Sequence, residues 1–179
     1  MTEPSNAAAE LDYLTFVDYA VDKAYRELPQ VDPVAMRLVL TLHRVTSALA
    51  YDLESTVHRP NGWSWSGFRV LFVVWLAGAM EAKRIAELSG NSRAAVSALV
   101  NTLERDGLVT RTRALHDGRA VEIALTDKGR DAIAGAFEQH NRREQAWANA
   151  LSKPEQRVLT GLLEKLMHGM DEVARKRRT

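Results

Sequence analysis

Residues 83–125 constrain the fold most, because two short helical patterns are followed at once by two runs of alternating apolar and polar side chains. Helices are expected over 83–89 and 92–106, and a glycine follows each and would end it. Two short helices joined by a turn of about three residues that contains glycine are typical of a helix-turn-helix. The alternation over 108–113 and 120–125, around a polar turn, predicts a β-hairpin. A helix-turn-helix followed directly by a hairpin predicts a winged helix.

The rest of the chain is predicted to be helical, because apolar side chains recur along it at intervals of three and four residues. Helices are expected over about 11–28 and 34–57, with prolines marking the break between them, and then in a short segment capped by Ser64. Thr126 is expected to cap a long helix, and residues 152–155 form a capping box that begins the last one. The predicted fold class is mainly α (α+β), with a winged helix-turn-helix whose wing is a small β-hairpin.

Cysteine is absent from the 179 residues, which excludes disulfides, iron–sulfur clusters and thiolate metal sites. No apolar run approaches the ~18 residues of a membrane span, and no secretory signal is visible, so a cytoplasmic protein without membrane contact is expected. There is no glycine-rich phosphate loop and no nucleophile–histidine signature, so neither an enzyme nor a cofactor is expected. The five histidines do not pair at i, i+4, so no metal site is expected unless its ligands assemble in space.

The net charge of +1 is unevenly distributed along the chain. Residues 1–60 carry five basic and nine acidic side chains, whereas residues 83–130 carry nine basic and six acidic ones. Local basic excess in a near-neutral protein is what a DNA-contacting module would show, although ordinary surface variation gives the same balance. Charge alone leaves both interpretations open.

The second helix of the helix-turn-helix has a buried face and a slim outer face. The buried side of a helical wheel consists of Val96, Leu99, Val100 and Leu103. A major groove about 12 Å wide accepts a helix whose outer face is slim, and the alanines opposite the buried side offer methyl groups to thymine. A serine and an asparagine on this face can hydrogen-bond base edges. The residues predicted to contact DNA from this helix are Ser92, Arg93, Ala94, Ala95, Ser97, Ala98, Asn101 and Arg105.

The predicted hairpin carries arginines at its tip and along its first strand. Arg119 is at the tip, and an arginine on a narrow projecting hairpin can enter a minor groove, where the potential is most negative. Asp117 lies two residues before it, close enough to hold a guanidinium by a bidentate pair. An ordinary turn with a surface ion pair is the alternative. Arg111 and Arg113 alternate with threonines along the strand and are expected to point one way, as phosphate contacts.

These motifs together resemble the core of the MarR family of bacterial transcriptional regulators. The resemblance is carried by the stretch AKRIAELSGNSRAAVSALVNTLERDGLVTRTRALHDGRAVEIALTDKGR and extends over about residues 35–170. It implies a homodimer that pairs through its first and last helices and places two winged lobes on a pseudo-palindromic operator in double-stranded DNA. It also implies a repressor that a small-molecule effector releases, with Arg119 as the wing arginine and Asp117 as its acidic partner.

On this interpretation the chain has three parts. Residues 1–60 are N-terminal helices, namely an extra arm helix and the first dimerisation helix, residues 61–126 are the winged helix-turn-helix DNA-binding domain, and residues 127–179 are C-terminal dimerisation helices. A similar extra helix occurs in the urate-responsive subgroup of the family, in which an acidic residue on the helix of Trp65 helps to bind the ligand. Here Arg69 stands at that position, so urate is not expected.

Arg69 is predicted to lie inside the apolar arc of its helix, and a buried arginine needs a partner. That partner is either an acidic side chain on a neighbouring helix, as in a structural ion pair, or the carboxylate of a small anionic aromatic effector. Members of the MarR family, which this sequence resembles, commonly bind such molecules between the dimer helices and the winged lobe. The residues predicted to line this pocket are His58, Trp63, Trp65, Phe68 and Arg69.

A protein-interaction module is the alternative function, in which the winged helix contacts a partner protein and does not bind DNA. Binding of DNA by the purified protein at low salt separates the two interpretations.

Overall fold

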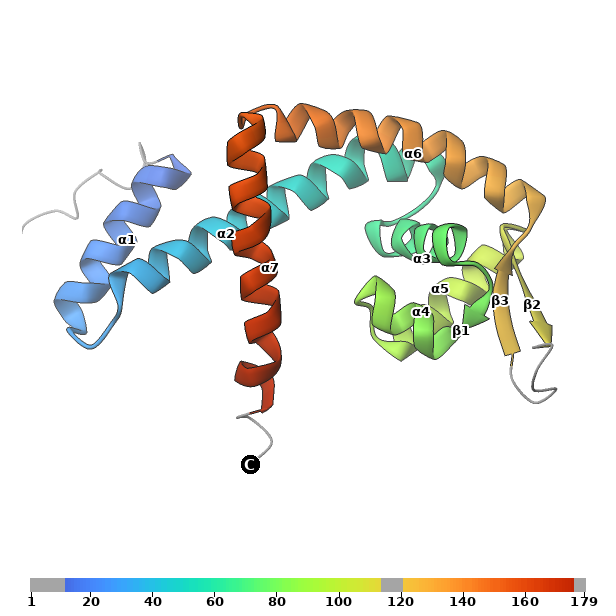
Figure 1. Cartoon of the computed structure of the whole chain (residues 1–179), viewed down its shortest axis with the longest axis horizontal. Helices are drawn as coiled ribbons and strands as arrows, with labels where there is room; N and C mark the ends of the chain where they lie inside the picture. The colour runs from blue at the N-terminus through green and yellow to red at the C-terminus, as the bar shows by residue number, and fades with distance from the viewer. Residues whose placement is uncertain (1–11, 114–120, 176–179) are drawn as a thin grey trace, which may run out of the picture. The chain divides into compact units, whose positions relative to one another are not determined.

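The structure is a computed structural model that describes residues 12–113 and 121–175, with side chains as far as residue 169. The predicted tip residues Asp117 and Arg119 therefore lie outside the described residues. The chain divides between Asp52 and Leu53 into two compact units (Figure 1). No helix in the described parts of the chain is long and apolar enough to cross a membrane.

The first unit is a pair of helices, α1 (Tyr13–Glu27) and α2 (Pro33–Leu53). The carboxylate of Asp12 caps α1 by accepting a hydrogen bond from the Thr15 N–H, with 2.8 Å between the two atoms. The Tyr13 hydroxyl donates to the carbonyl of Leu40 at 2.9 Å and so joins the two helices. Val17 and Val21 of α1 are buried, whereas much of the apolar surface of both helices remains exposed.

The helix expected over 34–57 is regular only as far as Leu53. It continues as a π-helix, η2 (Glu54–His58), and a turn of 3₁₀-helix, η3 (Arg59–Asn61). Pro60 explains why α geometry stops here, because proline has no N–H to donate and its ring clashes with the carbonyl four residues earlier. Gly62 then reverses the chain with a φ of 81°, in the left-handed region.

The second unit is a winged helix-turn-helix followed by two long helices. Its elements after η3 are α3 (Trp65–Ala77), β1 (Met80–Glu81), α4 (Ala82–Ser89), α5 (Arg93–Arg105), β2 (Val109–Arg113), β3 (Val121–Leu125), α6 (Asp127–Ala148) and α7 (Lys153–Arg175). Local sequence signals set several boundaries, because the hydroxyls of Ser64, Ser92 and Thr126 each accept the N–H of the residue three positions later. The predicted winged helix is confirmed.

The sheet has three antiparallel strands in the order β1-β3-β2. The predicted hairpin is present as β2 and β3, with Val109 opposite Leu125 and Arg111 opposite Ile123. Strand β1, in which Met80 pairs with Ile123, was not expected from the sequence. Two residues are too few to show alternation, so only pairing with β3 identifies them as a strand.

One core holds the winged helix together. Side chains from α3, α4, α5, the strands and α6 meet in it, and the fully buried members include Val70, Leu71, Ile85, Val96 and Ile133. Burial of this kind stabilises a fold by roughly 25 cal/mol for each Å² of apolar surface removed from water. The core therefore determines which faces of α5 and β2 remain at the surface.

Candidate nucleic-acid interface

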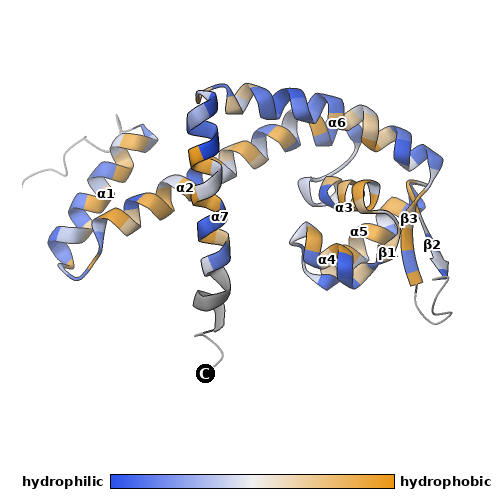
Figure 2. Cartoon of the chain, viewed as in Figure 1, coloured by the Kyte–Doolittle hydropathy of each residue, from blue (hydrophilic) through white to orange (hydrophobic). Residues whose placement is uncertain are grey.

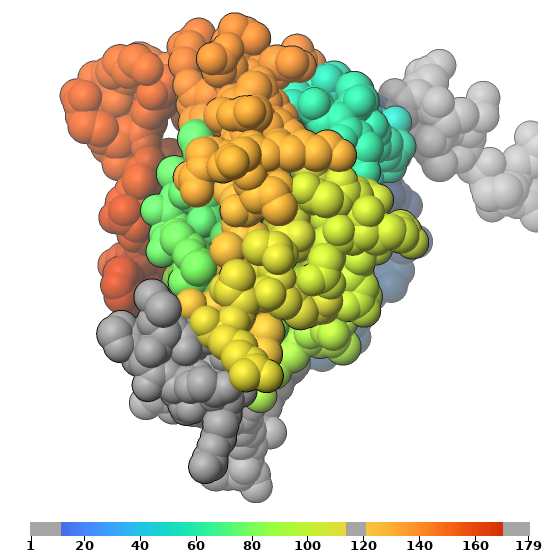
Figure 3. Space-filling model, turned by 90° about the vertical axis from the view of Figure 1, so that its right-hand side faces the viewer, coloured from blue at the N-terminus to red at the C-terminus, as the bar shows by residue number. Residues whose placement is uncertain are grey.

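Helix α5 presents its outer face to the surface because its inner face is buried. Val96, Val100 and Leu103 are at most 3% exposed, and Leu99 is half-buried. The exposed residues of the predicted outer face are Ser92, Arg93, Ala94, Ser97, Ala98, Asn101 and Arg105, and Ala95 is half-buried. Figure 3 shows α5 and β2, in yellow-green and yellow, together on the face turned to the viewer. The predicted exposure is confirmed, whereas contact with DNA remains a prediction.

The side chain of the exposed strand arginine Arg111 contacts helix α5. Its guanidinium forms an ion pair with the carboxylate of Glu104, and its Nη2 donates to Oδ1 of Asn101 at 2.6 Å. Both partners are on α5, so Arg111 connects the strand to the helix. Arg111 lies opposite the buried Ile123 in the strand register, yet its side chain is exposed, so a phosphate contact by Arg111 remains a prediction.

The other cations around α5 differ in their surroundings. Arg93 and Arg113 are exposed at the start of α5 and the end of β2. The Nε atom of Arg105 lies 3.7 Å from the carboxylate of Asp106, a long and exposed ion pair of little energetic weight. The Nζ atom of Lys128 donates to the Asp106 carbonyl at 2.8 Å, which places a cation at the C-terminal end of α5.

The residues predicted to line an effector pocket come together, but as packed rings. The ring centroids of His58 and Phe68 are 4.2 Å apart, and those of His58 and Trp65 are 5.2 Å apart, in stacked arrangements. Trp63 is also buried. The rings lie in contact with one another instead of standing apart around a hollow, and their role in ligand binding remains a prediction.

Arg69 is half-buried and not buried as predicted, so burial alone requires neither of the two predicted partners, an acidic side chain or an effector carboxylate. Its Cζ lies 5.8 Å from the centre of the Trp65 ring, in a cation–π contact. The guanidinium also lies close to Gly90, where an added Cβ would be 2.6 Å from Nη2. No carboxylate among the described residues forms an ion pair with Arg69. Helical periodicity placed this side chain too deeply because a long arginine side chain bends toward the solvent.

A buried histidine pair is the feature of this unit that the sequence did not predict. Nε2 of His58 lies 3.0 Å from Nδ1 of His140, and Nε2 of His140 lies 3.0 Å from the carboxylate of Glu144. Because the carboxylate accepts, His140 carries its proton on Nε2, and His58 donates to the bare Nδ1 of His140. His58 and His140 are 82 residues apart, so no local spacing could have indicated the pair.

Burial and the neighbouring His140 lower the pKa of His58 to about 4, while Glu54 acts in the opposite direction. His58 is fully buried, and its Nδ1 has no hydrogen-bond partner among the described residues. Neutral histidine suits these surroundings, since a buried imidazolium would lack solvation. The part of the chain described here contains no cluster of three or more side chains arranged to hold a metal ion.

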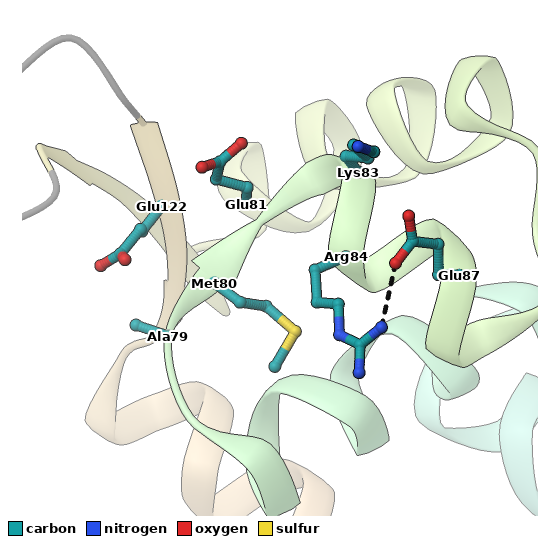
Figure 4. A pocket seen from close by; sticks show the side chains of 7 residues that line it. All are labelled: Ala79, Met80, Glu81, Lys83, Arg84, Glu87 and Glu122. Atoms are coloured by element: carbon teal, nitrogen blue, oxygen red, sulfur yellow. Dashed lines mark hydrogen bonds and ion pairs between the residues drawn. The ribbon is translucent and has the colours of Figure 1, made fainter. Parts of the chain in front are cut away.

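A hollow of about 330 Å³ lies elsewhere, between β1, the start of α4 and β3 (Figure 4). It is lined by Ala79, Met80, Glu81, Lys83, Arg84, Glu87 and Glu122. Arg84 Nη1 already donates to Glu87 at 3.0 Å. With three carboxylates and two cations, one of them paired, this hollow does not suit an anionic aromatic molecule.

A helix-turn-helix with a slim, exposed second helix, followed by a hairpin, defines the winged-helix class of DNA-binding regulators. Residues 63–121 match the sequence model of the MarR family. The chain is 33% identical over 132 residues to the uncharacterised HTH-type transcriptional regulator YwaE of Bacillus subtilis. The aligned region covers 74% of this chain and 77% of YwaE. The chain belongs to the MarR family and is a DNA-binding transcriptional regulator. DNA binding is thereby favoured over the protein-interaction alternative.

Solved structures of transcriptional regulators share the fold. BpsR of Bordetella bronchiseptica, whose DNA binding is regulated by 6-hydroxynicotinic acid, is 19% identical with a TM-score of 0.67, over 73% of this chain and 98% of that one. NadR, solved in complex with 4-hydroxyphenylacetate, is 21% identical with a TM-score of 0.61, over 71% of this chain and 89% of that one. At these identities the likeness is one of fold.

Proposed function

We propose that two copies of this chain form a cytoplasmic homodimer that represses transcription by binding a pseudo-palindromic operator in double-stranded DNA. The observation that carries this proposal is the outer face of α5, which is exposed, slim and free of large side chains near Ala94 and Ala98. Such a face fits the major groove, and the serine and asparagine beside the alanines supply hydrogen bonds to base edges.

Exposed apolar side chains on the long helices support self-association. On α7, Val158, Leu162 and Leu166 recur every four residues and are 63%, 56% and 46% exposed within one chain. Figure 2 shows apolar residues along both α2 and α7. A single chain leaves these faces in water, and a second copy would cover them by coiled-coil packing.

Selection from random DNA sequences tests operator and dimer together. Wild-type protein is expected to sediment as a dimer and to select two inverted half-sites about one helical turn apart, because a two-fold dimer places its recognition helices ~34–36 Å apart. The double substitution Leu162→Glu with Leu166→Glu is expected to give folded monomers with much weaker operator binding.

Thr160→Glu is the matched control, because Thr160 is exposed on the opposite side of the same helix from this seam. It introduces a glutamate into the same helix, one charge where the double substitution introduces two, and should leave the dimer intact. A wild-type monomer, or a dimer that survives the double substitution, would contradict the proposed interface.

A small anionic aromatic acid is proposed as the effector that releases the operator. Arg69 supplies a half-exposed guanidinium that stacks on Trp65 and lacks a carboxylate partner in the described parts of the chain. A carboxylate on an aromatic ring would find both a charge-assisted hydrogen bond and a ring surface here. Hydroxylated aromatic acids of this class act on BpsR and occur in the NadR complex.

A panel of aromatic acids, including 6-hydroxynicotinate and 4-hydroxyphenylacetate, is expected to contain a compound that weakens operator affinity at least fivefold. Fluorescence anisotropy with labelled operator DNA measures this change. Arg69→Gln should abolish the response and keep operator affinity, whereas Arg142→Gln, at an exposed position of α6, should keep both. Unchanged affinity across the panel would refute the effector and leave DNA binding standing.

A further inference from the structure

The contact between Arg111 and Asn101 fixes the orientation of the Asn101 side-chain amide, and therefore which of its atoms, Oδ1 or Nδ2, is turned away from Arg111. A guanidinium has only hydrogen-bond donors, so the amide atom that faces it must be Oδ1. The structure has this orientation, with 2.6 Å between Arg111 Nη2 and Asn101 Oδ1. Asparagine amides are often free to flip, but the flipped form would set two donors against each other here.

Glu104 holds the arginine in this position. Its carboxylate forms an ion pair with Arg111 Nη1, one turn of α5 beyond Asn101. The strand also restricts Arg111, because its opposite residue Ile123 is buried and fixes the side of the sheet on which the arginine lies. The side chains of Glu104, Arg111 and Asn101 thus form a bridge between α5 and β2, which we call the amide clamp.

The amide clamp changes what Asn101 can recognise. A free asparagine pairs with adenine by two hydrogen bonds, accepting from N6 with Oδ1 and donating to N7 with Nδ2. With Oδ1 already accepting a charge-assisted bond from Arg111, one lone pair of that oxygen is used and its acceptor strength toward a base falls, whereas both Nδ2 N–H groups can still be offered to a base. Guanine presents two neighbouring acceptors, N7 and O6, in the major groove, whereas adenine presents the acceptor N7 beside the N6 donor.

We propose that Arg111 is a specificity-determining positioning residue, which makes Asn101 a donor that prefers guanine over adenine at the base it contacts. This rests on the proposed placement of the outer face of α5 in the major groove. It also reverses the prediction from sequence for Arg111, since a guanidinium neutralised by Glu104 does not serve as a free phosphate contact.

Base preference and salt dependence, measured together, test this proposal. Affinities for the selected operator and for its single-base variants are measured for the wild type, Arg111→Ala and Arg111→Lys. Arg111→Ala is expected to reduce discrimination between guanine and adenine at one position of each half-site about tenfold, the scale of one good base contact. Arg111→Lys retains a donor beside Oδ1 and should keep most of the wild-type preference.

Two further variants separate this effect from a loss of fold or of charge. In an Asn101→Ala background, Arg111→Ala should have no additional effect on base preference. Arg119→Ala, at the predicted wing tip, is expected to weaken binding to most sequences and to lower the slope of log affinity against log salt by about one, whereas Arg111→Ala should leave that slope unchanged. Circular dichroism verifies that each variant is folded.

The outcomes separate this proposal from the one on which it rests. The amide clamp would be overturned if Arg111→Ala left the base preference unaltered and lowered the slope of log affinity against log salt by about one. That result would show that Arg111 is an ordinary phosphate contact. A wild-type protein that selects no sequence at all would instead overturn the placement of α5 in the major groove.

Discussion

Gly129→Ala is expected to destabilise the winged helix by about 3 kcal/mol or more, at or beyond the upper end of the usual cost of overpacking a core. A Cβ at this position would be 1.9 Å from the carbonyl oxygen of Leu108 and 2.8 Å from its carbonyl carbon. These are backbone atoms of the segment that joins α5 to β2, so a side-chain rotation cannot relieve the clash. The free energy of unfolding in urea measures the loss.

The same contact region holds the start of α6 against the winged helix. The Thr126 hydroxyl donates to the carbonyl of Gly107 at 2.7 Å, and the Thr126 N–H donates to the carbonyl of Leu108 at 3.0 Å. The Thr126 hydroxyl also accepts the N–H of Gly129 at 2.9 Å. Moving α6 to accommodate a methyl group would therefore break hydrogen bonds as well as packing.

Gly135→Ala provides the matched control within α6. Gly135 is exposed, and a Cβ there would have no neighbour within 4 Å. Alanine is the better helix former by about 0.8–1.0 kcal/mol, so this variant should be slightly more stable than the wild type. Equal stability of the two variants would show that the close approach at Gly129 has no energetic consequence.

The second large effect is a loss of stability in mild acid. Because the pKa of His58 falls from 6.5 to about 4 in the folded protein, the unfolded chain binds more protons between these values. Stability therefore rises with pH across this window, is complete above pH 6.5 and falls as the pH drops toward 4. The expected loss is about 3 kcal/mol, at roughly 1.4 kcal/mol for each unit of pKa difference.

His58→Gln isolates this contribution. The amide of glutamine can still donate to Nδ1 of His140 but cannot take up a proton, so the free energy of unfolding should depend much less on pH between 4 and 6.5. The variant should be less stable than the wild type at pH 7, because the stacking of His58 on Phe68 is lost. Denaturant unfolding at a series of pH values measures both effects.

His43→Gln, on the exposed side of α2, is the control and should keep the pH profile of the wild type. If His58→Gln retained the wild-type slope between pH 4 and 6.5, the acid sensitivity would belong to other groups. Glu54, which accepts the Trp65 N–H at 2.9 Å, would then be the next residue to test.

The winged topology and the capped helix starts could be predicted because they depend on local signals. Hydroxyl caps such as Ser92 act within three residues, and the left-handed turn at Gly90 is a property of one residue. The exposed face of α5 follows from helical periodicity alone once Val96 is placed inside. The same reasoning predicted Arg69 to be more buried than it is. Helical periodicity gives the direction of the Cα–Cβ bond, and it does not give the position of the guanidinium at the end of the side chain.

Sequence analysis was enough to predict the winged helix-turn-helix, its capping residues and the slim outer face of α5, because each depends on neighbours within a few positions along the chain. Three features required the folded structure: His58 contacts His140, Met80 and Glu81 form a strand, and Arg111 contacts Asn101 and Glu104. These contacts join residues on different elements, and only packing and strand register bring such residues together.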